Sequence, residues 1–521
     1  MKFYSRGNAR RSVFHTAVFR VLSQVSTLAS YIVLVRAMSE HEFGVLSLLY
    51  AFIPVVSTTA SLGIEQTLRG FQPEYLRAGN YSTATWLLRM AASARFLVNL
   101  LLLGIILLAW QWLAPLFQLT PYRHEFLIFS VLVLLHFQAS ILQVSLSSHM
   151  MQGYSVGMTV LLSVAKLIGY LVLKHFGLLT LDRAIMVDLA GYVLMYAGLR
   201  IAHSIYCRPP ASHPVVAPEP TERKRLLRYS LFNNFNDAGS LLLSSKSDNF
   251  FIGAMMNPVA VGAYAFYSRL AEMAAQLLPT RQFGNVVQPL FFAVSPAQAA
   301  DRLPKYFTLL LNLTGMLQLP IFAFAFAYHA EIVQVVFGGK FQNVSWVLPL
   351  ILGFATLNRV DDAVVLVAQY QEKASIVLLS KVFAIYNVIA MLVLVPIIGV
   401  YGAAVASGSA QVMKNALIWW HVRDIARWRN FRDVVIMTLV VWGGCIAVCE
   451  VLKHVLQLPV IAHLVIGAVV CAISALLFAR SSALSSSDRE ILGGVFHGRE
   501  ARIFEWLGIL RPKAATVGGS S

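Results

Sequence analysis

Long apolar runs constrain this chain more than any other feature of its sequence. A helix that crosses a bilayer needs roughly 20 mostly apolar residues, and we find fourteen segments that meet this requirement. The sequence therefore predicts an all-α polytopic membrane protein with about 14 transmembrane helices. The predicted spans are residues 13–36, 44–66, 90–113, 125–148, 155–175, 183–206, 229–253, 262–291, 306–334, 343–369, 374–397, 400–421, 433–453 and 458–480.

The composition excludes a water-soluble fold. Apolar residues make up 58% of the 521 residues and charged residues only 12%, whereas soluble chains are about 45–50% apolar and about a quarter charged. The four cysteines show no metal-ligand spacing, so we expect neither a disulfide framework nor a zinc site. We expect no cofactor. The cysteines are Cys207, Cys445, Cys449 and Cys471.

The distribution of positive charge predicts the topology. The net charge is +17, which in a soluble protein would suggest a nucleic-acid partner. In a membrane protein it indicates positive-inside loops first, and a basic pathway for an anionic substrate second. Lys and Arg gather in loops on one side, for example at 2–11, 223–228 and 423–432. We therefore expect both termini in the cytoplasm, no cleaved signal peptide and no nucleic-acid partner.

An internal repeat organises the chain. The segments 34–38 and 43–47 are echoed about 217 residues later by 251–255 and 261–265. The echo predicts two six-helix lobes in the same orientation with a cavity between them. The expected domains are an N-terminal lobe at 1–206, a Pro-rich cytoplasmic linker at 207–226, a C-terminal lobe at 227–425, two extra transmembrane helices at 426–480, and a cytoplasmic tail at 481–521.

Two short motifs resemble a known family. Residues 36–47 read Arg-Ala-Met-Ser-Glu-His-Glu-Phe-Gly-Val-Leu-Ser, which resembles the first-hairpin signature of the polysaccharide-transporter (Wzx-type) branch of the MOP flippase superfamily. Asp-Asn-Phe-Phe-Ile-Gly at 248–253, with Val-Gly-Ala-Tyr at 261–264, is similar to the signature that opens the second lobe. The resemblance implies a V-shaped pair of lobes with alternating access to a central cavity.

The same resemblance implies the substrate and its setting. Members of that branch move undecaprenyl-diphosphate-linked oligosaccharide repeat units from the inner to the outer leaflet, for O-antigen, capsule or exopolysaccharide assembly. We therefore expect a bacterial inner-membrane protein in contact with lipids and a lipid-linked oligosaccharide. A polysaccharide polymerase and a chain-length regulator are expected partners, and the protein is expected to be a monomer.

Cations inside the predicted spans are the candidates for substrate binding, because a charge in the bilayer is costly unless it has a role. A diphosphate carries about two negative charges, which Arg binds bidentately and Lys binds as a point charge. Arg20 could instead be an interfacial anchor, and Arg269 could pair with Glu272 on its own helix. The predicted substrate-binding residues are Arg20, Gln24, Lys246, Arg269, Arg359 and Lys381.

Carboxylates inside the spans are the candidates for proton coupling or for ion pairs within the lobes. Asp361 and Asp362 are adjacent, so they could share a proton, or they could simply neutralise Arg359. The family resemblance favours Asp248 as part of a lobe-holding salt bridge. The predicted coupling or pairing residues are Glu65, Asp188, Asp248, Asp361 and Asp362.

Three alternatives to this function stay open at this point. A peptidoglycan lipid-precursor flippase would also have a basic cavity. A multidrug or cation exporter of the same superfamily would need an acidic one, which the excess of Lys and Arg disfavours. A membrane glycosyltransferase or polymerase would share the lipid-linked substrate, but the sequence shows no Walker motif and no nucleophile constellation. We therefore do not expect an enzyme.

Overall fold

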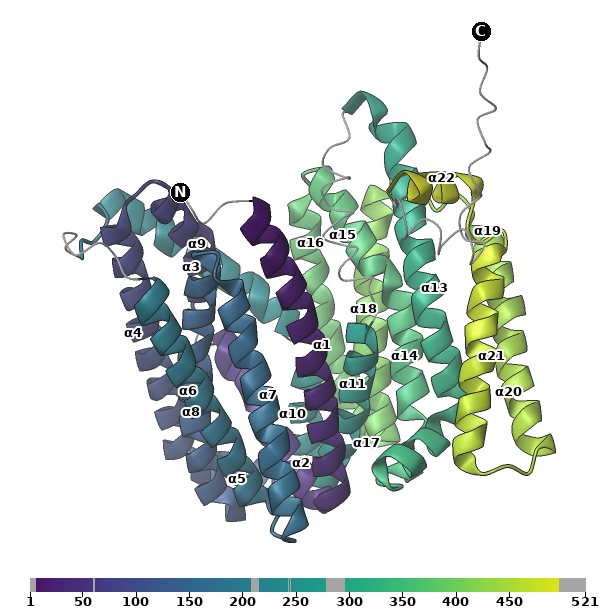
Figure 1. Cartoon of the computed structure of the whole chain (residues 1–521), viewed down its shortest axis with the longest axis horizontal. Coiled ribbons are helices and arrows are strands. Elements are labelled where there is room, and N and C mark those ends of the chain that lie inside the picture. The colour runs from purple at the N-terminus through teal and green to yellow at the C-terminus, as the bar shows by residue number, and fades with distance from the viewer. Residues whose placement is uncertain are drawn as a thin grey trace. The chain divides into compact units, whose positions relative to one another are not determined.

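The computed structural model describes residues 6–59, 61–207, 215–241, 243, 245–277 and 296–495 (Figure 1). These residues form helices and turns, without a strand among them, so the predicted all-α membrane fold is confirmed. Within the described ranges, nine segments are long and apolar enough to cross a membrane, and the predicted total of fourteen is not confirmed. They are Glu40–Thr59, Tyr81–Leu108, Thr120–Ser148, Gln152–His175, Leu181–Tyr206, Ala300–Phe337, Ser375–Ile398, Phe431–Val455 and Val460–Arg480.

The chain divides into two compact units. The N-terminal unit consists of Met1–Phe266 and Val388–Ala403, and the C-terminal unit of Tyr267–Asn387 and Ala404–Ser521. The lobe boundaries expected from the repeat, 1–206 and 227–425, do not coincide with these limits and stay a prediction.

The N-terminal unit is built from long helices that pack side by side. In Figure 1, α1 runs along α7, and α8 contacts both α6 and α7. The helices of this part of the chain are α1 (Arg6–Ala37), α2 (Glu40–Thr59), α3 (Ile64–Arg77), α4 (Tyr81–Leu108), α5 (Trp110–Leu116), α6 (Arg123–Ser148), α7 (Gln152–His175), α8 (Leu181–Tyr206), α9 (Pro220–Leu241), α10 (Ser245–Met255) and α11 (Pro258–Leu277).

The second predicted span, 44–66, ends earlier than expected. Helix α2 stops at Thr59, and α3 begins after Leu62 and Gly63, which have φ values of 46° and 67°. The left-handed backbone at Gly63 favours glycine, and a Cβ there would overlap the Ser230 carbonyl of α9. A turn that glycine permits therefore divides the apolar run into two helices.

Part of the predicted linker 207–226 is helical and packs on the N-terminal unit. Helix α9 begins at Pro220, and Leu226 is buried in a core formed with residues of α3, α4 and α6. The Tyr75 hydroxyl donates a hydrogen bond of 2.8 Å to Glu222, and the Arg225 guanidinium lies 4.9 Å from the centre of the Phe71 ring. These contacts fix the start of α9 against α3.

The first-hairpin motif has a clear structural basis. Ser39 and Glu42 form a capping box at the start of α2, in which the Glu42 carboxylate accepts hydrogen bonds from the Ser39 amide and hydroxyl, and the Glu42 amide donates to the Ser39 hydroxyl. Gly44 lies against the Pro258 carbonyl at the start of α11, where a Cβ would overlap the oxygen. The motif therefore begins a helix and permits a close helix contact.

The C-terminal unit contains one long helix, α13, and several interrupted ones. The predicted spans 343–369 and 374–397 are broken by 3-10 turns at the residues that carry their charges, Arg359 and Lys381. The elements from residue 296 onward are α13 (Pro296–Phe337), η3 (Gln342–Val344), α14 (Val347–Leu357), η4 (Asn358–Val360), α15 (Asp361–Tyr370), α16 (Ala374–Leu379), η5 (Ser380–Val382), α17 (Phe383–Ile398), α18 (Val400–Val422), α19 (Phe431–Met437), the π-helical turn η6 (Thr438–Trp442), α20 (Gly443–Val455), α21 (Val460–Arg480) and α22 (Ser486–Val495). Of these, the part of α17 and α18 within Val388–Ala403 belongs to the N-terminal unit.

The two extra helices predicted at 426–480 pack on α13. Helices α20 and α21 are neighbours in Figure 1, and both contact α13. The predicted tail 481–521 begins with the short helix α22, which also contacts α13. Asp488 of α22 is buried and accepts a hydrogen bond of 3.0 Å from the Asn312 side chain of α13. This contact holds the start of the tail against the helical core.

Candidate functional site

Asp188 of α8 is a buried carboxylate in the interior of the N-terminal unit. Its side chain is 1% exposed, and the Lys166 ammonium of α7 lies 2.8 Å from Oδ1. The hydroxyls of Tyr50, from α2, and Tyr170, from α7, donate hydrogen bonds to its two oxygens. A buried charge is tolerated only when it is paired and hydrogen-bonded, and this carboxylate meets both conditions.

Small residues let α7 and α8 approach closely enough to make this pair. A Cβ on Gly191 would lie 3.3 Å from Cγ of Lys166, so a larger residue would crowd the lysine stem. Gly169 of α7 packs against the Val187 side chain of α8. Glycines at helix contacts are typical of membrane helices, where close packing replaces the hydrophobic effect. Lys166 and Tyr170 are four residues apart on α7, so both face α8.

A second buried charge in this unit is Arg95 of α4, whose side chain is 0% exposed. Its guanidinium donates to the Ser57 carbonyl at 3.0 Å and to the Ser57 hydroxyl at 3.3 Å. It lies 4.3 Å from the centre of the Phe137 ring and 4.0 Å from the Glu65 carboxylate. The cation is therefore stabilised by a carbonyl, an aromatic face and a distant carboxylate.

His136 of α6 lies between the two charged groups. Its Nδ1 atom is 3.2 Å from the Tyr192 hydroxyl of α8, and the ring is close enough to both Arg95 and Lys166 to interact electrostatically. Tyr192 follows Asp188 by four residues on the same helix face. Polar groups therefore extend from Arg95 to Asp188 through the interior of the N-terminal unit.

The C-terminal unit has an ion pair of its own. The Lys414 ammonium of α18 lies 2.9 and 2.8 Å from the two carboxylate oxygens of Asp361, the first residue of α15. One residue later on α18, the Asn415 side chain donates to Asn358 at 3.0 Å. Asp361 thus pairs with Lys414 and not with Arg359. These contacts link the broken segment α14–η4–α15 to α18.

Arg359 lies in the break between α14 and α15. Its guanidinium carbon is 5.1 Å from the centre of the Trp428 ring, and it occupies the space that a side chain at Gly315 of α13 would fill. Among the residues that the structure describes, no carboxylate lies within ion-pair distance of it. Its positive charge is therefore not neutralised within the described chain.

The remaining predicted cations differ in their surroundings. Gln24 is half-buried on α1, and Lys246 is exposed on α10. Arg269 pairs with Glu272 at 3.1 Å on α11, as its alternative interpretation anticipated. Lys381 lies in η5 and is partly buried. Arg20 belongs to α1, but its side chain lies outside the described part of the structure.

Most of the predicted carboxylates have partners. Asp188 and Asp361 form the ion pairs above, and Glu65 lies at the limit of an ion pair with Arg95. Asp248 is fully buried on α10 and accepts a hydrogen bond of 2.6 Å from the Tyr264 hydroxyl of α11. The side chain of Asp362 lies outside the described part of the structure.

Several residues of these clusters were not among the predicted site residues. Arg95 lies within the predicted span 90–113, so the rule on intramembrane charge would have found it. The same rule points to Lys166 and Lys414. Tyr50 and Tyr170 give no such signal, because tyrosine in an apolar helix is ordinary core, and only the fold brings their hydroxyls to Asp188.

The fold has counterparts among solved structures. It is similar to that of the lipid II flippase MurJ in an inward closed conformation, with a TM-score of 0.68 and 12% identity over 89% of this chain and 97% of that one. It is also similar to an inward-facing multidrug resistance MATE family transporter of the MOP superfamily, with a TM-score of 0.61 and 11% identity over 77% and 94% of the two chains. The structure therefore shares the fold of these two proteins.

The family follows from the sequence itself. The family model described as "Polysaccharide biosynthesis protein" matches residues 33–346. The chain belongs to this polysaccharide biosynthesis family, and the resemblance seen in the two hairpin motifs is confirmed. A search of curated proteins finds no match. The protein is a multi-pass membrane protein of that family.

Proposed function

We propose that the protein is a flippase that moves undecaprenyl-diphosphate-linked oligosaccharide repeat units from the inner to the outer leaflet by alternating access. The products would serve O-antigen, capsule or exopolysaccharide assembly. The family membership supports a role with polysaccharides. The fold supports transport, since it is shared with a protein described as a lipid II flippase and with a MATE transporter.

The observation that carries the proposal is that no carboxylate among the described residues neutralises the charge of Arg359. Within the described helical cores, the carboxylates of Asp188 and Asp361 are neutralised by Lys166 and Lys414. Arg359 has an aromatic ring beside it but no described carboxylate in reach. An intramembrane cation without a counter-charge indicates a functional site, and a diphosphate is an anion that a guanidinium binds bidentately.

The same pairing pattern disfavours an exporter of organic cations. Such a substrate needs a carboxylate whose charge is available to it. In the part of the chain that the structure describes, Asp188 and Asp361 are already engaged by lysines, and Glu272 is paired with Arg269. Arg359 and Lys381 in the C-terminal unit, and Arg20 and Lys246 in the N-terminal unit, would instead offer positive charge to an anionic substrate.

In this proposal, the pair of Lys166 and Asp188 is the coupling element of the N-terminal unit. Proton uptake by Asp188 would remove its attraction for Lys166 and release the two helices that the pair joins. Tyr50 and Tyr170 would keep the carboxyl group hydrogen-bonded in either state. The contact between α7 and α8 would thus have a paired and a released state, and a proton gradient could shift the equilibrium between them.

The cellular setting is part of the proposal. We place the protein in a bacterial inner membrane with both termini in the cytoplasm, as the positive-inside pattern predicts. It would act as a monomer and deliver its lipid-linked product to a polysaccharide polymerase and a chain-length regulator.

The test compares three substrates in proteoliposomes that contain the purified protein. The substrates are a fluorescent polyprenyl-diphosphate oligosaccharide, a fluorescent peptidoglycan lipid precursor and a cationic dye. We expect rapid transbilayer exchange of the first, read by a membrane-impermeant quencher, under an imposed proton gradient. Exchange of the peptidoglycan precursor alone would assign the protein to that alternative, and dye transport alone would assign it to cation export.

A further inference from the structure

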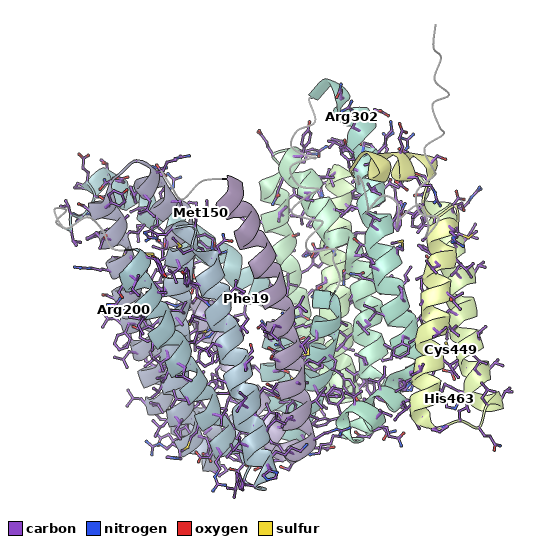
Figure 2. All side chains as sticks on the ribbon, viewed as in Figure 1. Phe19, Met150, Arg200, Arg302, Cys449 and His463 are labelled. Carbon is purple, nitrogen blue, oxygen red and sulfur yellow. The ribbon has the colours of Figure 1, made fainter. Side chains whose placement is uncertain are left out.

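Three of the four cysteines meet in the interior of the C-terminal unit. The Sγ atoms of Cys445, Cys449 and Cys471 all lie within 4.8 Å of one another, and those of Cys445 and Cys471 are 3.6 Å apart. The three residues are 3%, 0% and 4% exposed. Figure 2 labels Cys449 on the helix pair formed by α20 and α21. Three buried thiols therefore lie close together in the C-terminal unit.

The convergence results from helix geometry that sequence spacing does not show. Cys445 and Cys449 are four residues apart on α20 and therefore share a face. The chain reverses over a short connection between Val455 and Val460, so α21 presents Cys471 to that face. Gly467, one turn before Cys471, leaves room for the Tyr328 ring of α13. The spacing of the cysteines along the sequence does not show this proximity, and the expectation of neither a disulfide framework nor a zinc site stays a prediction.

The sulfur positions fit a three-coordinate metal better than a disulfide. Metal–sulfur bonds of about 2.3 Å place the three sulfurs of a trigonal site about 4.0 Å apart. The observed separations, from 3.6 Å to at most 4.8 Å, include this value. A disulfide needs a sulfur–sulfur distance of about 2.0 Å and joins only two of the three cysteines.

We propose that Cys445, Cys449 and Cys471 form a binding site for one soft, monovalent d10 cation of the Cu(I) class. Soft thiolate ligands select Cu(I), zinc and iron–sulfur clusters. Zinc prefers four ligands, and no His, Asp or Glu from the described residues joins the three sulfurs. Each sulfur that binds as a thiolate releases its proton to solvent.

The surroundings are those of a specialised site. Trp442, Phe478 and Tyr328 belong to the same buried cluster as the three cysteines, so the surroundings are aromatic and apolar. The π-helical turn η6 ends just before α20, and α13 departs from helical geometry at Tyr328, with φ −124° and ψ 22°. π-Helical turns inside helices frequently mark functional sites. The apolar surroundings would protect a Cu(I) ion from water and oxidation.

The test uses the purified full-length protein in lipid nanodiscs, reduced and without oxygen. Cu(I) is titrated against a chromophoric Cu(I) chelator, and bound copper is counted per chain. We expect one Cu(I) per chain, with sulfur neighbours at about 2.3 Å by X-ray absorption. Cys471→Ser should weaken binding about 100-fold. Cys207→Ser is the matched control, because Cys207 is a buried cysteine outside the cluster, and it should bind like the wild type.

A second measurement needs no variant of the cluster. Ag(I), a redox-inert substitute for Cu(I), should protect three of the four thiols of the wild-type protein from alkylation, as counted by mass spectrometry. It should also raise the melting temperature of the wild type and of Cys207→Ser. Absence of binding in the reduced wild type, or equal binding in Cys471→Ser, would overturn the proposal. A Cys445–Cys471 disulfide in the freshly purified protein would also overturn it.

Discussion

The Lys166 ammonium lies 2.8 Å from the Asp188 carboxylate, and the two side chains join α7 to α8 inside the N-terminal unit. Lys166 is 21% exposed and Asp188 only 1%, so the carboxylate depends on the lysine and on two tyrosine hydroxyls for its stability. Loss of Lys166 would leave a fully buried carboxylate without a counter-charge. The pair therefore links the charge state of one residue to the packing of two helices.

Removal of Lys166 alone should destabilise the protein strongly. Lys166→Met leaves the Asp188 charge buried without its partner, which typically costs about 3–5 kcal/mol. The double variant Lys166→Met with Asp188→Asn removes both charges and should recover most of the loss. Thermal unfolding in detergent measures the effect. Lys305→Met is the control, because Lys305 pairs with the exposed Asp301, and equal destabilisation by both lysine variants would contradict a special role for Lys166.

Gly44→Ala should disturb the first hairpin. An alanine Cβ would overlap the Pro258 carbonyl, and overpacking of this kind costs about 1–3 kcal/mol. Gly104→Ala on α4 is the matched control, since a Cβ there meets nothing within 4 Å, and helix propensity predicts a gain of about 1 kcal/mol. The measurement is the melting temperature of each variant. If Gly44→Ala has the same melting temperature as the wild type, the close contact with Pro258 is not essential.

The attachment of α22 should weaken as pH rises. Burial raises the pKa of the Asp488 carboxyl, although hydrogen bonds from Ser485 and Asn312 oppose the shift. A carboxyl with a raised pKa in the folded state stabilises the fold at pH values below its ordinary pKa of about 3.9, and this stability is lost as pH rises through the raised value. Asp488→Asn cannot ionise, so its stability relative to the wild type should increase between pH 4 and 7. A constant difference across that range would contradict the shift.

The topology has a direct test. The positive-inside pattern places both termini in the cytoplasm. A fluorescent protein that folds only in the cytoplasm should therefore fluoresce when fused after Ser521. An alkaline phosphatase fusion at the same place should be inactive, because the enzyme is active only after export. Active phosphatase would reverse the predicted orientation.

The fold could be predicted from apolar runs and two short motifs, but its interruptions could not. Hydropathy averages over roughly 20 residues, so a turn at Gly63 or a 3-10 break at Arg359 disappears within the average. The backbone at these points depends on tertiary contacts, such as Ser230 beside Gly63 and Gly315 beside Arg359. Such contacts join residues far apart in the sequence.

The sequence predicted the candidate site only in part, because it does not show which residues of different helices meet. Intramembrane charge identified Asp188 and Asp361 as important, yet their partners lie on other helices and follow only from packing. The same limitation hid the thiol cluster, because Cys471 is 22 residues beyond Cys449 and is brought back by the reversal after α20. Spacing along one helix is visible in sequence, whereas proximity between helices is not.

The most direct test of the account is the flipping rate of Arg359→Gln with the polyprenyl-diphosphate oligosaccharide. This variant has a shorter side chain that is still polar and can still donate hydrogen bonds, and it removes the charge that has no described partner. We predict a loss of at least about tenfold, which corresponds to roughly 1.4 kcal/mol, with unchanged melting temperature. Lys305→Gln, which removes a positive charge that is already paired with Asp301, should flip like the wild type. Wild-type rates in Arg359→Gln would contradict the claim that this cation serves an anionic lipid-linked substrate.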